Sequence, residues 1–329
     1  MDQLVDLYNY GDVSYINVQR GVRDTFLRKL CYLVETPFAR KVILGMPVEI
    51  YLEHKRLVDS QDTIVCVNDA ISFGILFYKM LGLIDGKVLA LFHSLPERLK
   101  HFRKRRWVIN FISKLLSHAD SVLTLSDYAK KPLVDTFRVP SGKLKTFYFG
   151  VDVDYWRPGV DGERKTFVLS VGNDMNRDYS TLVEAMPENM DLIIVTSKKV
   201  DTGGKPNIKV VSNIPDSELR DLYQTCRVAV IPSVKVEYES PGLSCALQAM
   251  ACKAPVVISD SLCHREYFVG DEHIYYYEPE NRSSLKGELQ RIADNYQEAL
   301  GIAVQGHGLV SEKFSTRNMA GAWQQVMEG

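Results

Sequence analysis

The sequence predicts an α/β protein with two Rossmann-like domains, each built on a parallel sheet. Short β-branched runs alternate with helix-like stretches along the 329 residues, and these runs are apolar without polar alternation. Strands that are buried on both faces of a parallel sheet have this composition. Because strand and helix alternate in two successive sets, we expect two such sheets with helices on both faces.

The expected elements follow from these runs. In the first half, strands are expected at 14–18, 42–44, 63–67, 88–92, 121–125 and 145–149. In the second half, they are expected at 167–171, 192–195, 208–211, 228–231, 256–258 and 274–277, with helices over 217–225, 243–252 and 285–299 among others. The turn-rich, polar segment 156–163 is the expected linker, so the first domain is predicted over 1–155 and the second from 156 onward. A ligand is then expected in the cleft between the domains.

Composition and charge exclude several classes of protein. The six cysteines are scattered without CxxC spacing, which predicts reduced thiols. No signal peptide is recognised, and the most apolar stretch, 70–92, is interrupted by Lys79, Asp85 and Lys87, so a cytoplasmic protein without a membrane span is expected. No metal-ligand spacing is evident, because Asp152 and Asp154 belong to a turn before the linker. The net charge of -1 conceals a basic first half and an acidic second half, which hints at an anionic partner for the first.

The segment 228–260 is the most informative part of the sequence. It places a strand, an acidic loop, a small-residue helix and a second strand within one short βαβ unit. The loop carries Glu237, Tyr238 and Glu239, followed by the turn at Pro241 and Gly242. Open α/β sheets bind ligands at the carboxyl ends of their strands, so polar ligand groups are expected at this loop and at the helix that follows it.

Four motifs occur in order: FYFGVDVDYWRP at 147–158, VGNDMNRDYSTLVEAM at 171–186, SNIPDSELRDLYQTCRVAVIPS at 212–233 and LQAMACKAPVVISD at 247–260. Together they resemble a retaining glycosyltransferase of family 4, the glycosyl transferases group 1, with the GT-B fold. The resemblance covers residues 86–325. The tail VSEKFSTRNMAGAWQQVM is similar to the closing helices of such enzymes, which implies a second domain over 156–308 and a helix over 309–329 that crosses back to the first domain.

The resemblance implies a reaction. A sugar would move from a UDP- or GDP-sugar to a hydroxyl group of a glycan or lipid-linked acceptor, with retention of configuration and without a metal or other cofactor, in the synthesis of cell-surface polysaccharide or glycoconjugate. No residue is an obvious nucleophile for a double displacement. We therefore expect departure and attack on one face of the sugar, with the leaving phosphate oxygen taking the proton of the acceptor hydroxyl.

The chemistry needs cations at the departing diphosphate. Arg177, after Gly172 and at the start of a helix, stands where the family has a basic pair. Asn173 replaces the usual first arginine, and Lys198 is the candidate to replace that charge. The remaining residues that the resemblance assigns to the nucleotide sugar are Asn213, Ile214, Gly242, Leu243, Ser244 and Gln248.

The acidic loop departs from the family pattern. Gln248 occupies the position of a glutamate that binds the ribose, and an amide can still exchange hydrogen bonds with a diol. Glu239 lies one residue out of register with the other glutamate of the family, which contacts the sugar. We expect Glu239 to take this role if the turn at Pro241 absorbs one residue, with Glu237 as its competitor.

In the first domain, His93 follows the strand 88–92 at its carboxyl end, where the family has a histidine near the donor sugar. We expect it to orient a substrate rather than to act as a general base. With Glu239 and Arg177 it completes the expected catalytic set. Ser126 ends the next strand and Gly21 follows the strand 14–18; both are assigned to the acceptor side.

The densest positive charge lies at 98–106, which holds six Lys and Arg in nine residues. The sequence continues as an amphipathic pattern, so this segment is expected to begin a helix. A solvated helix face, a nucleic-acid patch and a contact with anionic lipid headgroups are the three interpretations. No nucleic-acid module accompanies the patch, so nucleic acid is not an expected partner. The membrane interpretation assigns peripheral contact to Arg103, Lys104, Arg105, Arg106 and Trp107.

Two other classes of function stay open. The amide at Gln248 and the single glycine at Gly21 leave room for a non-catalytic GT-B-shaped subunit that binds nucleotide or glycan and supports a partner enzyme. A nucleotide-sugar epimerase shares the two-domain architecture and would need acid and base carboxylates around the sugar. Only Glu237 and Glu239 offer them.

Overall fold

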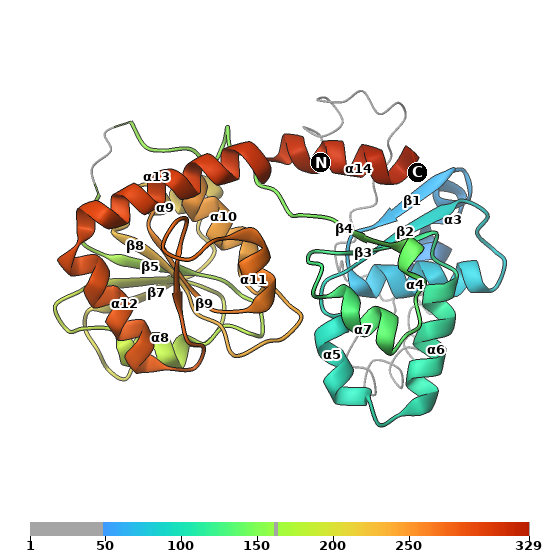
Figure 1. The fold of residues 1–329 in the computed structure, drawn as a ribbon, viewed down its shortest axis with the longest axis horizontal. Helices are drawn as coiled ribbons and strands as arrows, with labels where there is room; N and C mark the ends of the chain where they lie inside the picture. The colour runs from blue at the N-terminus through green and yellow to red at the C-terminus, as the bar shows by residue number, and fades with distance from the viewer. Residues whose placement is uncertain (1–48, 161–163, 329) are drawn as a thin grey trace. The chain divides into compact units, whose positions relative to one another are not determined.

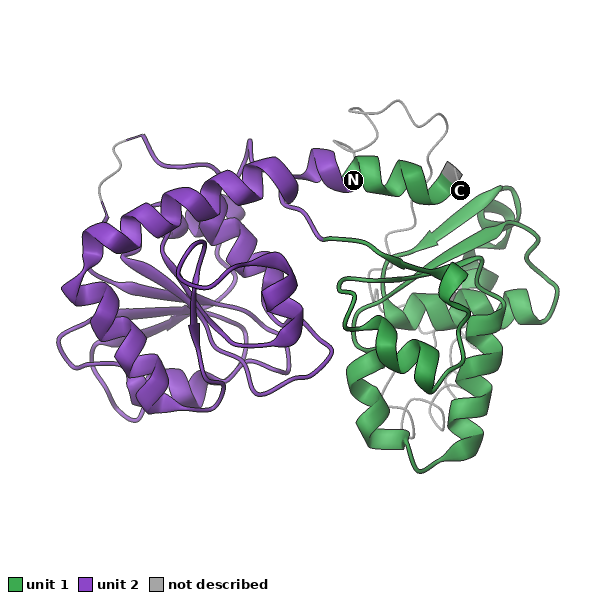
Figure 2. Cartoon of the chain, viewed as in Figure 1, with its two compact units in different colours: residues 1–148, 320–329 green, residues 149–319 purple. Residues whose placement is uncertain are grey.

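A computed structural model of the chain describes residues 49–160 and 164–328 (Figure 1). Gly21 and the strands expected at 14–18 and 42–44 lie outside these ranges. The chain forms two compact units (Figure 2): unit 1 comprises residues 1–148 and 320–329, and unit 2 comprises residues 149–319. Each unit contains one sheet in which every described strand pairing is parallel. The predicted α/β class with two parallel sheets is therefore confirmed.

The described part of unit 1 contains a four-stranded sheet in the order β1-β2-β3-β4. Its strands are β1 (Thr63–Cys66), β2 (Lys87–Phe92), β3 (Ser121–Thr124) and β4 (Leu144–Thr146). Its helices are α3 (Glu49–Asp59), α4 (Asp69–Met80), α5 (Leu95–Phe102), α6 (Arg106–Ser117) and α7 (Lys130–Asp135), with a 3-10 turn at Ser141–Lys143. Helix α14 (Thr316–Glu328) ends in this unit, where the ring of Trp323 lies 4.2 Å from that of Phe147 between centroids.

Helix α6 shows why these residues form a packed helix. Val108, Ile112, Leu115 and Leu116 recur at helical spacing, and all four are fully buried. Apolar residues at this spacing form one stripe along a helix, which packs against the core while the other side stays in water. The stripe joins the core of unit 1 beneath the sheet.

Unit 2 contains a six-stranded sheet in the order β10-β9-β8-β5-β6-β7. Its strands are β5 (Val168–Val171), β6 (Leu192–Val195), β7 (Ile208–Val211), β8 (Val228–Ile231), β9 (Val256–Ser259) and β10 (Tyr275–Tyr277). Its helices are α8 (Tyr179–Ala185), α9 (Asp216–Thr225), α10 (Leu243–Ala251), α11 (Leu262–Tyr267), α12 (Arg282–Asp294) and α13 (Tyr296–Lys313). Alternate residues of β8 belong to two separate cores: Val228 and Val230 pack with α8 and α12, and Ala229 and Ile231 pack with α10. Both faces of this sheet are therefore covered, as the unbroken apolar runs predict.

The strand order locates a ligand site without reference to any relative. From β5 the chain builds outward through β6 and β7, and then returns to place β8 on the other side of β5. In open α/β sheets, the two loops that leave the carboxyl ends of strands at such a reversal diverge to opposite faces and leave a crevice for a ligand. In unit 2 these are the loops after β5 and after β8.

Two sequence-based expectations about helices were wrong. The single helix expected over 285–299 is two helices, α12 and α13, because Asn295 between them has a non-helical backbone with φ −125° and ψ 52°. The basic segment does not begin one helix either. It covers the end of α5, a turn and the start of α6, since Arg105 has non-helical backbone angles before α6 begins at Arg106. Within the described ranges, no helix combines the length and apolarity needed to span a bilayer.

Three glycines in α13 give a test of this packing. Gly301 and Gly308 are exposed, and a Cβ on either would meet nothing within 4 Å, whereas a Cβ on Gly306 would lie 2.7 Å from the carbonyl oxygen of His273. We expect Gly301→Ala and Gly308→Ala each to raise the free energy of unfolding by about 0.5–1 kcal/mol through helix propensity. Gly306→Ala should lower it by about 1–3 kcal/mol through overpacking. Urea denaturation followed by circular dichroism measures all three, and a stabilising Gly306→Ala would contradict the packing of α13 described above.

Candidate functional site

The loops after β5 and β8 are tied together by backbone hydrogen bonds. Arg177 and Ser233 form an antiparallel bridge. The N–H of Val234 donates to the carbonyl of Asn176 at 2.9 Å, and that of Asp178 donates to the carbonyl of Pro232 at 3.2 Å. The two loops at the reversal of the sheet therefore form one pre-organised structure.

Arg177 is the centre of this structure. Its side chain is 1% exposed. Nε donates to the carbonyl oxygen of Val171, at the end of β5, over 3.2 Å, and Nη2 lies 3.5 Å from Sγ of Cys245 on α10. The guanidinium thus connects the end of β5 to the first turn of α10.

Two glycines make room for the guanidinium. A Cβ built on Gly172 would lie 2.6 Å from Cζ of Arg177, and one built on Gly242 would lie 2.6 Å from Nη2. Both glycines also have positive φ, +151° and +77°, which side chains with a Cβ rarely adopt. No other residue type fits either position, so the sandwich of one arginine between two glycine turns explains both glycines at once.

The positive charge of Arg177 is only partly offset. Asp174 is its ion-pair partner, at 3.3 Å from Nη1, but Asp174 is 39% exposed and screened by water. Among the described residues, Nη1 has no hydrogen-bond partner although it is buried. Lys198 adds a second cation close by, because its Nζ donates to the backbone carbonyl of Asp174 at 2.9 Å. Two cations, one buried and one half-buried, therefore lie at the loop after β5, beside the carboxylates of Asp174 and Asp178.

Asn173 has a structural task. Its Oδ1 accepts hydrogen bonds from the N–H of Ser197 at 2.7 Å and from the hydroxyls of Thr196 and Ser197 at 3.0 Å. The Thr196 hydroxyl also lies 2.7 Å from the carbonyl oxygen of Gly172, so its one proton is shared between this oxygen and Oδ1 of Asn173. The hydroxyl of Tyr179 donates to the same carbonyl at 2.6 Å. These bonds lock the Gly172 turn to the end of β6.

The acidic loop is anchored through Asn176. Its Nδ2 donates to Oε2 of Glu239 over 2.5 Å, and Glu239 is half-buried. Glu237 is exposed. The structure thus brings Glu239 against the loop after β5. Asn176 was not identified from the sequence, because no motif or spacing links it to a carboxylate 63 residues away.

Helix α10 points its amino terminus at this loop pair, with Gly242 as the N-cap residue. The first N–H groups of a helix lack intrahelical partners and carry partial positive charge. Leu243 is buried, so only its backbone can meet a ligand, whereas Ser244 and Gln248 are half-buried on successive turns. Asn213 is exposed after β7 with φ 55°, next to a half-buried Ile214.

A neutral histidine lies behind the loops. His264 is fully buried, with Nδ1 3.0 Å from the carbonyl oxygen of Ser259. Burial, followed in effect by the charge of Arg177, lowers the pKa of His264 to about 4 although the carbonyl bond opposes this. The hydroxyl of Ser259 in turn pairs with that of Ser233. His264 is therefore neutral near pH 7 and does not add a second positive charge behind Arg177.

In unit 1, His93 follows β2 and is half-buried. Its ring Nε2 lies 2.9 Å from the carbonyl oxygen of Val67, and its backbone N–H donates to the carboxylate of Asp69 at 3.0 Å. Ser126 is 1% exposed, and its carbonyl accepts from the hydroxyl of Thr124. A substrate contact by the Ser126 side chain would therefore require this segment to move.

No group of three or more His, Cys, Asp or Glu with the geometry of a metal site occurs in the described ranges.

Comparisons with known proteins agree with this architecture. The family described as glycosyl transferases group 1 matches residues 162–303, and the family described as glycosyltransferase family 4 matches residues 30–155. The two matches adjoin and together cover most of both units. The chain belongs to the group 1 glycosyltransferases. The resemblance to the glycosyl transferases group 1 that the four motifs indicated is thus confirmed, and the chain has a glycosyl transfer function.

Solved structures share the fold. HepE from Anabaena, in complex with UDP and glucose, is 13% identical, with a TM-score of 0.72 over 85% of this chain and 81% of that chain. Sucrose-phosphate synthase from Thermosynechococcus elongatus is 18% identical, with a TM-score of 0.72 over 95% and 82%. A glycosyltransferase from Rickettsia africae is 15% identical, with a TM-score of 0.65 over 99% and 86%. At these identities the likeness establishes the GT-B fold. No curated protein matches the chain in sequence.

Substitution of Arg177 and substitution of Gly172 should have the same effect on ligand binding. Because a Cβ on Gly172 would displace the guanidinium, we expect Gly172→Ala and Arg177→Gln to weaken the binding of a nucleoside diphosphate by tenfold or more, on the order of 1.4 kcal/mol. Isothermal titration calorimetry with UDP, GDP and ADP measures this. Gly287→Ala, where a Cβ meets nothing within 4 Å, is the matched control and should bind as the wild type does. Tight binding by Gly172→Ala would show that the sandwich is irrelevant to the ligand.

Proposed function

We propose that this glycosyltransferase moves a sugar from a nucleotide-diphosphate sugar, a UDP- or GDP-sugar, to a hydroxyl group of a glycan or lipid-linked acceptor with retention of configuration. Synthesis of a cell-surface polysaccharide or glycoconjugate is the proposed setting. The observation that carries this proposal is the buried arginine between two glycine turns at the reversal of the sheet in unit 2. Arg177, Lys198 and the amino terminus of α10 meet there, which suits a departing diphosphate.

The leaving group is the main electrostatic problem of this reaction. Cleavage of the bond between the sugar C1 and the phosphate oxygen places negative charge on the diphosphate. Arg177 is proposed to stabilise this charge from beneath the Gly172 and Gly242 turns, with the N–H groups of α10 and the Lys198 ammonium nearer the ligand. The sequence led us to expect direct contact between Arg177 and the phosphate. The Arg177 side chain is 1% exposed and cannot reach solvent in this conformation, so the proposed role differs from that expectation. A low-dielectric position lets a fixed charge act over a longer distance than it would in water.

Retention follows if both bond changes occur on one face of the sugar. In the proposed step, the bond from C1 to the phosphate oxygen breaks and a bond from C1 to the acceptor oxygen forms on the same face. The acceptor proton passes to the departing phosphate oxygen, which balances charge without a protein base. Glu239 is proposed to orient sugar hydroxyls, Gln248 to bind the ribose diol and His93 to contact a substrate hydroxyl. This chemistry is proposed to need no metal ion.

The position of Glu239 gives the experiment that tests this function. Asn176→Asp would set a second carboxylate against Glu239 and push it from its place, so we expect kcat to fall roughly 10–100-fold, as for loss of a hydrogen bond to a charged group. Release of nucleoside diphosphate from a panel of nucleotide sugars measures kcat, with magnesium or with EDTA. Gln297→Glu, the same charge change at an exposed site on α13, is the control and should stay active.

The products decide the remaining alternatives. NMR of the anomeric proton should show the configuration of the donor retained; an inverted product would overturn the one-face mechanism. Nucleotide binding without any turnover would favour the non-catalytic subunit, and conversion of the donor sugar without an acceptor would favour the epimerase.

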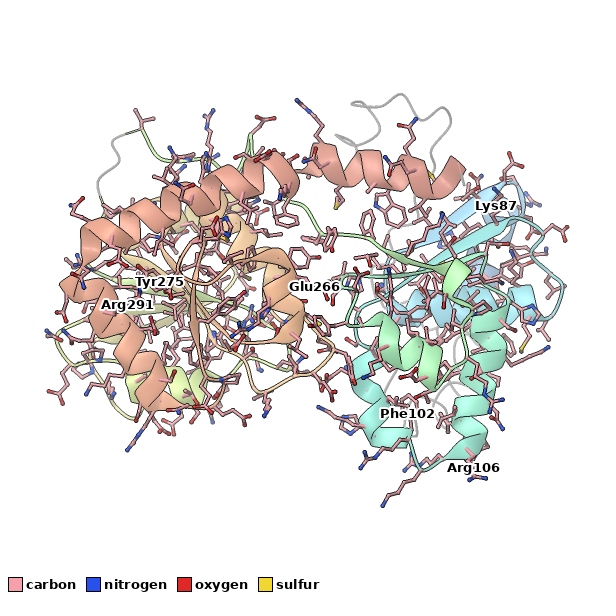
Figure 3. All side chains as sticks on the ribbon, viewed as in Figure 1. Lys87, Phe102, Arg106, Glu266, Tyr275 and Arg291 are labelled. Carbon is pink, nitrogen blue, oxygen red and sulfur yellow. The ribbon has the colours of Figure 1, made fainter. Side chains whose placement is uncertain are left out.

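Unit 1 offers a surface for an anionic membrane, and we propose peripheral contact there, at the inner face of the membrane. The turn between α5 and α6, together with the first two residues of α6, exposes Arg103, Lys104, Arg105, Arg106 and Trp107. Among the described residues, Arg103, Lys104 and Arg106 take part in no ion pair. Figure 3 labels Arg106 at the start of α6 and Phe102 at the end of α5. Phe102 is 0% exposed and belongs to the core of unit 1, so it anchors the turn to the core and does not enter the lipid interface.

Each basic residue near an anionic bilayer contributes about 1 kcal/mol. The double variant Arg103→Glu with Arg106→Glu should therefore lower binding to phosphatidylserine-containing vesicles roughly thirtyfold or more, and the loss should shrink as salt rises. Cosedimentation measures this. Lys209→Glu with Lys286→Glu, the same charge change at two exposed lysines of unit 2, is the matched control. Equal losses in both double variants would mean that net charge, and not this turn, governs binding.

A further inference from the structure

Helix α5 of unit 1 has a carboxylate from another element at its amino terminus. Asp69, the first residue of α4, is 6% exposed. One oxygen accepts from the N–H of Leu95 at 2.7 Å, the other accepts from that of His93 at 3.0 Å, and both receive the N–H of Ser94 at 3.1 and 3.2 Å. Three successive backbone donors thus converge on one buried side chain.

This arrangement fills a place where a ligand anion would otherwise bind. The carboxyl end of a parallel strand followed by a helix amino terminus attracts anions. Here the cap residue Ser94 makes no side-chain capping bond of its own, and Pro96 has no N–H to donate. Asp69 therefore replaces both the local cap and any external anion. A phosphate or carboxylate group of a substrate would find these donors occupied and a negative charge already in place.

The same contacts fix the state of His93. A carbonyl oxygen only accepts hydrogen bonds, so the contact of 2.9 Å between Nε2 and Val67 requires the proton to lie on Nε2. In the neutral imidazole, Nδ1 then carries the lone pair. No residue in the described part of the chain hydrogen-bonds Nδ1. With its backbone held by Asp69 and its ring held by Val67, His93 presents one acceptor atom to a substrate.

We propose that Asp69 is a positioning residue that sets His93 to accept a hydrogen bond at Nδ1 from a neutral hydroxyl group of the substrate. This rests on the proposed function, because it deepens the part given there to His93. The substrate class follows from the charge: the group that meets His93 is a sugar hydroxyl and not a phosphorylated or carboxylated position.

A double-mutant cycle separates positioning from general stability. We expect Asp69→Asn, which exchanges one acceptor oxygen for a donor, to lower kcat/KM by roughly tenfold or more. In the His93→Gln background, the same change should cost less than about twofold, because the residue through which it acts is gone. Asn68→Ala is the control: the Asn68 side chain caps α4 through the N–H of Ile71 at 3.0 Å, and among the described residues it makes no hydrogen bond to the loop of His93. It should lower the melting temperature and leave kcat/KM unchanged. Equal losses for Asp69→Asn in both backgrounds would overturn the proposal.

The tautomer of His93 gives a second test of the role of Asp69, and this test needs no enzymatic turnover. With ¹⁵N-labelled histidine in the full-length protein, His93 is assigned by comparison with His93→Gln. The proposal requires a protonated Nε2 and a bare Nδ1 in the wild type, and a mixture of tautomers in Asp69→Asn. Should Asp69→Asn fail to fold, Asp69→Glu, which keeps the charge but shifts the loop, replaces it. A protonated Nδ1 in the wild type, or no change in either variant, would refute the role of Asp69.

The two experiments also separate this proposal from the proposed function. If the wild type turns over no nucleotide sugar, the proposed reaction fails while the tautomer of His93 still tests Asp69. If the wild type is active and the tautomer is the wrong one, only the role of Asp69 fails.

Discussion

The burial of one guanidinium between two glycine turns is the constraint on which unit 2 depends. A charge removed from water is unfavourable unless protein groups hold it in place. Arg177 meets this requirement through the carbonyl of Val171, the sulfur of Cys245 and the ion pair with Asp174. Each contact lies on a different segment, so satisfying the arginine also fixes the distance between β5 and α10. Gly172 and Gly242 are consequences of the same burial, since any Cβ there would overlap the side chain.

Both units hold a buried charge at the carboxyl edge of their sheets, and the two charges have opposite sign. In unit 2 the charge is the arginine under the loops after β5 and β8. In unit 1 it is Asp69, which occupies the donors that begin α5. A fixed positive charge favours a diphosphate, and an occupied helix terminus leaves only neutral partners. The carboxyl edge of a parallel sheet thus carries one buried charge in each unit, and its sign differs between the two proposed sites.

The sequence revealed more of the fold than of the side-chain contacts. Unbroken apolar runs located each described strand to within a few residues, because a strand buried on both faces admits little else. The motif around Gly172 and Arg177 marked the loop at the reversal of the sheet, because the close approach of the guanidinium requires glycine there. Asn176 and Asp69 were missed because their partners lie 63 and 26 residues away. Polar residues of this kind look like ordinary turn and cap residues until the chain is folded.

The division of the chain between the units has a consequence for its synthesis. Unit 2 is one continuous stretch, 149–319, whereas unit 1 includes 320–329, whose Trp323 packs on Phe147. Domains fold as they leave the ribosome, beginning from the amino terminus. All of unit 2 is synthesised before residues 320–329 of unit 1. Unit 1 is therefore the domain whose synthesis starts first and whose core is completed last. Until residues 320–329 are made, Trp323 does not cover the surface around Phe147.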